Sequence, residues 1–503
     1  MLIWSNLLQP IRSRQTESVP KSPNDNRSPF KKDFDTVCNS TILRRLQDKA
    51  QVFPLEKEDY ARTRLTHSIE VMSICESLGY QAISIILSKD EKYISESKDK
   101  ENETKKLIND IPFILKTAAL LHDMGNPPFG HLGEEVIGEW FRKNLGKLSF
   151  NSDKELVFNS SSEPKETLEY LFKGSYAEDL KHFEGNAQLL RLVTKLCFVV
   201  DDNGMNLSFP VMASFIKYPT ASTRIDKNAG LLTKKMGYFS AEQEIFKNIT
   251  SKLGLKNCRH PLAYLLEAAD DIAYLTADIE DAHRKGLISL KTITDYFEEQ
   301  KEDKLVSRVL DAIQSYIKKA QELGYEDEED YVVHRIRVLI KGLMIDSMND
   351  ALNNVYDLIM QGEFNDELIN VSSACCIAKT LRKIEKDNIY YCSHILKTKT
   401  QAIAVLNKLL DVYVPAIVNW NEKSDANSDK PNNLLYLSLS KNYRYICQVA
   451  NQKYKDKSMD ELQPKELENY IYNKILLVTD QISGMTDSHA LTVYRTITAN
   501  SVT

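Results

Sequence analysis

The sequence predicts an all-α protein with little strand. Apolar residues recur at helical spacing in one segment after another, whereas the strict alternation typical of a half-buried strand is rare. Between residues 288 and 420 the chain is a succession of amphipathic segments. Two polar stretches, at 88–110 and 147–168, are rich in Lys, Glu, Asp, Ser and Asn and are expected to be solvated excursions from a helical core. The hydrophobic content of 42% is ample for such a core.

The N-terminal part is expected to become ordered only after a tail. Residues 1–32 are rich in Ser, Pro, Asn and Arg, which predicts a flexible N-terminal tail. Helical spacing over 41–53 ends at Pro54, because proline stops a helix. A second helix is expected from Arg64 to about Leu87.

Further helices are expected along the rest of the chain. The predicted ranges are 112–121, which is rich in Ala and Leu, then 135–145, about 182–200, 262–283, several between 288 and 420, and others up to about 494. The stretch 421–433 predicts a loop. We expect the tail 1–32, a helical core over 33–290 and a C-terminal helical region over 291–503 that packs on the core.

Composition excludes several classes of protein. Lys and Arg number 65 against 71 for Asp and Glu, and the net charge of −6 argues against a protein defined by a nucleic-acid-binding surface. The eight cysteines are scattered without CxxC spacing, so neither a disulfide framework nor a zinc site is expected. The N-terminus is too short and polar for a signal peptide, and no run approaches the length needed to span a bilayer. We therefore expect a soluble, cytoplasmic protein without a membrane partner.

The most reactive stretch is residues 112–134. An apolar helix ends there on His122 and Asp123, and His131 and Glu134 follow after a turn with two glycines and two prolines. Neighbouring His and Asp side chains can reach one metal ion only where their helix ends, and the glycines and prolines end it. Such a pair is common by chance, so it predicts a metal site only together with other ligands.

A second group of polar side chains lies in the long helix expected over 262–283. Asp270, Tyr274 and Asp278 are spaced at i, i+4 and i+8 and therefore share one face. Alanines beside them keep the surface small and leave room for a ligand. A carboxylate stripe on a mostly apolar helix is hard to bury without a cation, although a solvent-facing acidic edge is an equal alternative.

The order of these residues resembles a known family. His67, His122-Asp123 and Asp270 form the pattern H…HD…D of the HD-domain metal-dependent phosphohydrolases. The short sequence motifs around these residues are similar to those of one branch of the family, the deoxyguanosine triphosphate triphosphohydrolases, and occur in the same order. These motifs occupy residues 44–46, 51–56, 62–68, 122–131, 182–188, 267–272 and 482–487.

The resemblance implies a fold, a reaction and a metal site. The fold would be an HD-domain helical core with additional C-terminal helices, and the reaction would convert dGTP and water to deoxyguanosine and inorganic tripolyphosphate. His67, His122, Asp123 and Asp270 would be the metal ligands, a mixed N/O set that suits Mg²⁺ or Mn²⁺, with Fe²⁺ or Co²⁺ as further candidates. Asp271 competes with Asp270, which is preferred because it shares the helix face described above.

The resemblance also implies that His131 and Glu134 are the catalytic pair. A histidine kept protonated by a nearby carboxylate can give a proton to the departing sugar oxygen, or can activate water in the reverse role. The alternative for His131 is a structural histidine that caps the next helix.

Several further residues are expected to bind the substrate, because a triphosphate needs cations around it. By the same resemblance, Gln51 would contact the base, Asp278 would accept from the 3′-hydroxyl, and Tyr274 would exclude a ribose 2′-hydroxyl. Each could instead be an ordinary polar residue, and Lys234 competes with Lys235 for phosphate. The complete predicted set is Gln51, Arg64, His182, Asn186, Lys217, Tyr218, Lys235, Tyr274 and Asp278.

Three alternatives stay open at the level of sequence. They are a broad-specificity dNTP triphosphohydrolase, another HD phosphodiesterase, and a nucleotide-responsive protein that binds single-stranded DNA through a fold with a vestigial metal site. The family also implies a homo-oligomer, often a hexamer, and single-stranded DNA as a partner of some members; the composition shows neither. The stretches 88–110, 147–168 and 219–232 differ in length from the family, and the last of these borders the predicted phosphate-binding residues.

Overall fold

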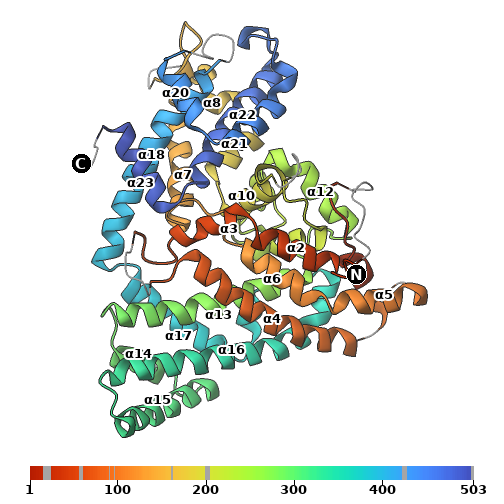
Figure 1. Cartoon of the computed structure of the whole chain (residues 1–503), viewed down its shortest axis with the longest axis vertical. Helices are drawn as coiled ribbons and strands as arrows, with labels where there is room; N and C mark the ends of the chain where they lie inside the picture. Colours follow the sequence, from red (N-terminus) through yellow and green to blue (C-terminus); the bar gives the residue numbers. More distant parts are fainter. Residues whose placement is uncertain are drawn as a thin grey trace.

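The computed structural model describes residues 1–14, 24–55, 61–89, 91–95, 97–159, 163–198, 204–421 and 428–499. Within these ranges the regular secondary structure is almost entirely helical (Figure 1), and the one sheet is an antiparallel hairpin of β1 (Leu148–Phe150) and β2 (Leu156–Phe158). The prediction of an all-α fold is confirmed.

Three helices form the centre of the fold. They are α4 (Arg64–Ser88), α6 (Ile111–Leu121) and α13 (Pro261–Arg284). Helix α4 packs extensively along α6, and α13 packs against both. Small residues permit this close packing: a Cβ added at Gly79 of α4 would lie 3.1 Å from the Cα atom of Pro112 on α6. Helices α6 and α13 both carry a proline in the first turn, where its missing N–H is not needed.

The remaining helices lie around this centre. They are α2 (Pro29–Cys38), α3 (Thr41–Arg45), α5 (Lys98–Ile108), α7 (His131–Asn144), α8 (Leu168–Leu171), α9 (Ser175–Lys181), α10 (Gly185–Arg191), α11 (Phe209–Phe215), α12 (Gln243–Lys252), α14 (Leu290–Glu298), α15 (Lys304–Leu323), α16 (Glu328–Gln361), α17 (Cys375–Ile384), α18 (Ser393–Asn419), α20 (Pro431–Ser438), α21 (Lys441–Asn451), α22 (Pro464–Ser483) and α23 (Asp487–Ile497). Helix α16 packs on α13 and α4, and α18 packs on α7 and α22. In Figure 1, α14, α15 and α16 lie at one end of the molecule, and α20, α21 and α22 lie at the other. The boundary predicted at 290/291 stays a prediction.

The flexible tail expected over 1–32 stays a prediction, but the described start of that segment is folded against the rest of the chain. A short helix, α1 (Trp4–Leu7), lies in the core, and the indole of Trp4 donates a hydrogen bond to the hydroxyl of Tyr356 at 2.8 Å. The polar composition of the whole segment concealed four apolar side chains near its start, which are buried: Leu2, Trp4, Leu7 and Leu8. Residues 15–23 lie outside the described residues.

Smaller differences concern the ends of elements. The helix expected over 41–53 is only α3 followed by a 3₁₀ turn, Leu46–Asp48, because residue 50 pairs with residue 63 in an extended bridge. The polar excursion 88–110 contains α5, and the excursion 147–168 contains the β-hairpin. Two expected ends lie outside the described residues: Glu56, the last residue of the motif 51–56, and the end near residue 200 of the helix expected from about 182.

Two long helices correct the expectation that no segment approaches the length needed to span a bilayer. Among the described residues, α4 and the part of α18 from Ile395 to Asn419 are long and apolar enough to cross a bilayer by length and composition, with mean hydropathies of 1.3 and 1.4. Inside the fold, 44% and 56% of these apolar windows are buried. Since the core helix of a soluble protein passes the same test, these helices are weak evidence for a membrane span.

Candidate metal centre and active site

Four predicted metal ligands converge from three distant parts of the chain. His67 lies in α4, His122 and Asp123 follow the last turn of α6, and Asp270 lies in α13. The Nε2 atom of His67 lies 3.1 Å from Oδ1 of Asp270, and Nε2 of His122 lies 3.5 Å from the same oxygen. One possible ligand atom from each of His67, His122 and Asp123 lies within 4.8 Å of the other two.

The imidazole rings are oriented with nitrogen atoms left free. Nδ1 of His122 lies 2.6 Å from the carbonyl oxygen of Ala119, which directs Nε2 toward the carboxylates. Within the described chain, Nε2 of His122 and Nδ1 of His67 are buried and have no hydrogen-bond partner. Leaving a buried polar atom unpaired costs free energy, so this arrangement suits ligation of a cation by His122.

Basic side chains keep the carboxylates ionised. Asp123 accepts hydrogen bonds from Nη1 of Arg64 and from Nδ2 of Asn126, both at 2.6 Å, and Asp270 accepts one from Nζ of Lys217 at 2.7 Å. Burial opposes ionisation, but Arg64 holds the pKa of Asp123 below its usual value, and Lys217 does the same for Asp270. Two imidazoles and two ionised carboxylates fit a divalent cation that prefers nitrogen and oxygen ligands.

The neighbouring Asp271 lies outside this cluster. Its Oδ2 atom pairs at 2.9 Å with Nη2 of Arg382 on α17. The geometry therefore favours Asp270 over Asp271 as the metal-facing residue of α13.

His131 and Glu134 form a hydrogen-bonded pair at the start of α7. Nδ1 of His131 lies 2.9 Å from Oε2 of Glu134, and the other oxygen of Glu134 accepts the backbone N–H of Gly185 at 2.9 Å. The carboxylate of Glu134 raises the pKa of His131. His131 in turn lowers the pKa of Glu134 to about 2, although burial of Glu134 acts in the opposite direction. The His131 side chain is 74% exposed, so its ring can exchange a proton with a bound molecule.

Arg64 lies between the metal cluster and the catalytic pair. One of its nitrogen atoms binds Asp123, and a Cβ added at Gly130 would lie 2.2 Å from its Nη2 atom. Gly130 has φ 61° and directly precedes His131. The turn therefore needs glycine here, both for its backbone conformation and for the approach of the guanidinium group.

The predicted phosphate-binding residues lie beside these two groups. Lys217 contacts Asp270, and Nζ of Lys235 lies 3.7 Å from Glu134. Tyr218 is buried, with the guanidinium of Arg259 lying 5.5 Å from its ring centroid. Arg259 also donates to the backbone carbonyl of Lys217, which fixes the Lys217–Tyr218 segment.

The residues of the motif at 182–188 lie in two different environments. Nδ2 of Asn186 donates to Glu184 at 2.8 Å, and Glu184 also pairs with Lys235 at 2.8 Å. His182, in contrast, pairs with Glu178 at 3.3 Å and exposes 40% of its side chain. No hydrogen bond or ion pair recorded for the described residues joins His182 to the catalytic pair.

Two of the predicted nucleoside-binding residues have buried polar atoms without partners among the described residues. In the described ranges, Oδ1 of Asp278 and Oε1 of Gln51 are both buried and make no hydrogen bond. Burial and the nearby Glu385 raise the pKa of Asp278 well above its usual value, and burial likewise raises the pKa of Tyr274. Free polar atoms of this kind are expected where a polar ligand binds.

Comparison with known proteins decides the family. A Listeria innocua protein named deoxyguanosinetriphosphate triphosphohydrolase-like protein is 37% identical over 493 residues, which are 98% of each chain. This chain belongs to that family. A Yersinia enterocolitica protein named deoxyguanosinetriphosphate triphosphohydrolase is 30% identical over 492 residues, covering 93% of this chain and 94% of the relative. No family model matches the chain. Since the family is one of hydrolases, the chain is an enzyme of that class.

Two residues of the site were not predicted from sequence. Glu184 contacts both Lys235 and Asn186. Its place within the motif 182–188 was the sequence feature that could have indicated it. Glu385 follows α17, outside all of the motifs; it is 2% exposed, its Oε1 atom has no partner among the described residues, and burial raises its pKa to about 8. No sequence signal pointed to Glu385.

Proposed function

We propose that this chain hydrolyses dGTP to deoxyguanosine and inorganic tripolyphosphate. The observation that carries the proposal is the separation of two groups of side chains by one glycine- and proline-containing turn. A cluster of histidine and aspartate that fits a divalent cation lies before the turn, and the pair His131–Glu134 lies after it. The names of the two relatives support the choice of dGTP as substrate.

The proposed metal is Mg²⁺ or Mn²⁺, with Fe²⁺ and Co²⁺ as further candidates. His67, His122, Asp123 and Asp270 would hold it, because two imidazoles and two ionised carboxylates supply the nitrogen and oxygen atoms that these ions bind. When bound, such an ion neutralises charge that develops on the phosphate oxygens during the reaction.

His131 acts as the general acid in the proposed reaction. Water forms a bond to the α-phosphorus while the bond from this phosphorus to the 5′ oxygen of deoxyribose breaks. His131 gives its proton to the departing oxygen, and the proton lost by the attacking water restores the histidine during the cycle. Glu134 keeps the imidazole protonated and fixes its orientation through Nδ1, so that Nε2 is the atom available to the substrate.

The basic residues bind the triphosphate. Arg64, Lys217 and Lys235 each pair with a carboxylate of the site, and a group with about four negative charges would share these cations. Lysine and arginine commonly bind phosphate through such charge-assisted hydrogen bonds. Tyr218, Asn186 and His182 complete the proposed lining, with His182 the most peripheral of them.

The deoxynucleoside would lie against the unpartnered oxygens. The amide of Gln51 can both donate to and accept from a base, and Asp278 can accept from the 3′-hydroxyl. Tyr274, one turn before Asp278 on α13, would leave no room for a ribose 2′-hydroxyl.

Product analysis tests the proposal directly. Purified protein with Mn²⁺ or Mg²⁺ and dGTP should release deoxyguanosine and tripolyphosphate, and EDTA should abolish the release. Formation of dGMP and pyrophosphate would instead identify a pyrophosphohydrolase. Equal rates on all four dNTPs would remove the preference for dGTP, and turnover of cyclic nucleotides would favour an HD phosphodiesterase.

We also propose that the enzyme works in the cytoplasm as a homo-oligomer, with a hexamer as the expected form, and that single-stranded DNA is a candidate partner. Light scattering of the purified protein tests the oligomer. Fluorescence anisotropy with a labelled oligonucleotide tests DNA binding; tight binding without turnover of any dNTP would support the DNA-binding alternative.

A further inference from the structure

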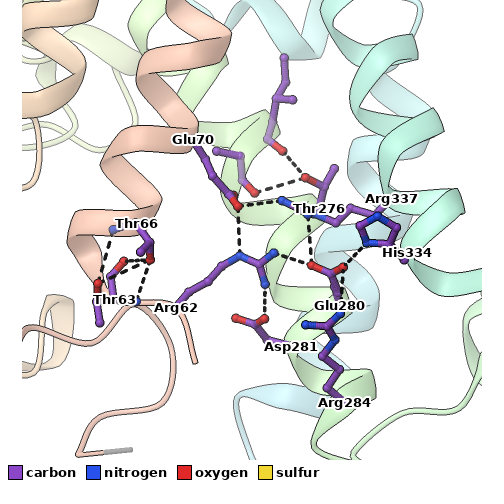
Figure 2. Close-up of polar contacts among 12 residues, drawn as sticks. Arg62, Thr63, Thr66, Glu70, Thr276, Glu280, Asp281, Arg284, His334 and Arg337 are labelled. Carbon is purple, nitrogen blue, oxygen red and sulfur yellow. Dashed lines mark hydrogen bonds and ion pairs between the residues drawn. The ribbon is translucent and has the colours of Figure 1, made fainter. Parts of the chain in front are cut away.

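A cluster of charged residues lies beside the site and centres on Arg62. The guanidinium group of Arg62 pairs with three carboxylates: Glu70 at 3.3 Å, and Glu280 and Asp281 at closer range (Figure 2). Glu280 and Asp281 are 2% and 4% exposed. Because buried carboxylates are costly without partners, Arg62 is held strongly in this position.

The cluster joins three helices. Glu70 belongs to α4, whereas Glu280 and Asp281 belong to α13. Arg337 of α16 contributes a second guanidinium, which pairs with Glu70 at 2.9 Å and with Glu280 at 3.2 Å (Figure 2). Arg62 and Arg337 therefore share two carboxylates, but their backbones lie in different surroundings.

The backbone around Arg62 pairs with the segment that carries Gln51. The N–H of Arg64 donates to the carbonyl of Lys49 at 2.8 Å, and residues 50 and 63 form an antiparallel bridge. The N–H of Gln51 donates to the carbonyl of Arg62 itself at 3.5 Å. Thr63 then caps α4 through reciprocal hydrogen bonds with Thr66 (Figure 2), so the direction in which this segment leaves the helix is fixed.

These contacts connect two side chains that have free, buried oxygens. Gln51 is attached through its backbone to Arg62, and Asp278 precedes Glu280 and Asp281 on α13 by less than one helical turn. Neither Oε1 of Gln51 nor Oδ1 of Asp278 has a hydrogen-bond partner in the described part of the chain.

We propose that Arg62 is a positioning residue: its guanidinium ties the segment 49–51 to α13, and thereby sets Gln51 at a fixed position relative to Asp278. The inference rests on the proposed function, in which these two side chains bind the deoxynucleoside. Arg62 itself does not touch the substrate. It acts by keeping two contacts to the same ligand in register, and a small misplacement of such groups weakens binding.

A matched pair of substitutions separates positioning from stability. Arg62→Gln removes the tie to the segment 49–51, whereas Arg337→Gln removes a guanidinium from the same two carboxylates without touching that segment. Both should lower the melting temperature. Only Arg62→Gln should raise KM for dGTP, by about tenfold, with a change in kcat below about threefold, because the lost interaction is binding of the ground state and transition state alike.

Two further measurements distinguish positioning from general loss of structure. Arg62→Lys keeps the charge but not the planar fork, so it should recover part of the KM. The unmodified protein should prefer dGTP over 2′,3′-dideoxyGTP, which lacks the 3′-hydroxyl. Arg62→Gln should lose most of this preference, and Arg337→Gln should keep it.

The outcomes separate the inference from the proposed function. Equal KM values and equal 3′-hydroxyl preference in Arg62→Gln and Arg337→Gln would overturn the inference while dGTP hydrolysis stands. If the unmodified protein binds dGTP without hydrolysing it, the proposed reaction fails, and the dissociation constants of the same variants for dGTP still test the inference. If the protein neither binds nor hydrolyses dGTP, both are overturned.

Discussion

Asp487, at the start of the last helix, binds the backbone of Phe129 in the turn that precedes His131. Its Oδ1 atom accepts the N–H of Phe129 at 2.8 Å, and its Oδ2 atom accepts the N–H of Ala50 at 3.0 Å. Phe129 has φ 65°, a conformation that is uncommon for a residue other than glycine. The carboxylate thus holds the turn against the segment that carries Gln51, and helix α23 contributes to the site from far away in sequence.

Substitution of Asp487 should therefore affect both stability and turnover. Asp487→Ala leaves two backbone N–H groups without their acceptor, and each buried unpaired donor costs about 1–3 kcal/mol. We expect a loss of roughly that size or more in the free energy of unfolding, measured by denaturant titration, together with a lower kcat for dGTP. Ser488→Ala is the control: its hydroxyl makes an exposed bond to Asp48, so the change should stay within about 0.5 kcal/mol. Equal behaviour of the two variants would exclude this role of Asp487.

Gly130 provides a test of the turn itself. Its φ of 61° and ψ of −133° lie outside the conformations open to other residues, and an added Cβ would lie 2.2 Å from Nη2 of Arg64. Gly130→Ala should displace Arg64 from Asp123 and lower kcat/KM by at least about tenfold, since misplacement of positioning groups has effects of this order. Steady-state kinetics with dGTP measures the effect.

Gly342→Ala is the matched control for that substitution. Gly342 lies in the interior of α16, and among the described residues a Cβ there meets no atom within 4 Å beyond its own helix backbone and chain neighbours. Alanine should leave kinetics unchanged and stabilise the helix by about 0.5–1 kcal/mol. Full activity of Gly130→Ala would mean that the turn tolerates a side chain and that the approach of Arg64 is not required.

The sequence was sufficient to predict the helices that build the site. The periodic, apolar segments from Arg64 and from Leu262 predicted α4 and α13 to within one or two residues. It was not sufficient where the composition is mixed. The buried Trp4 lies in a segment that is polar on average, and Leu148 and Leu156 are buried in a hairpin that lies in a polar excursion. In each case a few apolar residues decide the structure, and an average over the segment hides them.

The functional site likewise contains residues that the sequence predicted and residues that it did not. The sequence motifs around His67, His122 and Asp270 identified residues that lie close together in the structure, because each motif retains the pattern of the family. The roles of Arg62 and Glu385 could not be predicted, since they depend on packing between helices. Arg62 meets Glu280 across 218 sequence positions, and spacing along the chain carries no information about such a contact.

The pH dependence should report the pair His131–Glu134. Glu134 raises the pKa of His131, so the protonated acid persists to higher pH than in a free histidine and is lost as pH rises through the raised value. Glu134→Gln removes the negative charge. The basic limb of kcat/KM against pH should therefore move to lower pH, and the maximal rate should fall. Rate profiles for dGTP hydrolysis at saturating metal measure both.

Lys235 supplies a comparison of opposite sign. Its ammonium group lowers the pKa of His131, so Lys235→Met should move the same limb to higher pH, whatever its effect on KM. Movement of the limb in one direction for both variants, or no movement for Glu134→Gln, would show that another group titrates in this range.

Arg191 joins the core to the C-terminal helices through a buried ion pair. Its Nε and Nη2 atoms bind the two oxygens of Asp480 on α22, both at 2.7 Å, and its Nη1 atom binds Glu242 at 2.9 Å. Arg191→Met leaves the buried carboxylate of Asp480 without its cation, which should cost about 3–5 kcal/mol in the free energy of unfolding by guanidinium titration. Lys319→Gln removes one partner of an exposed pair with Glu322, so it should cost at most about 1 kcal/mol. A similarly small loss for Arg191→Met would mean that apolar packing of α22, and not this pair, holds the C-terminal region on the core.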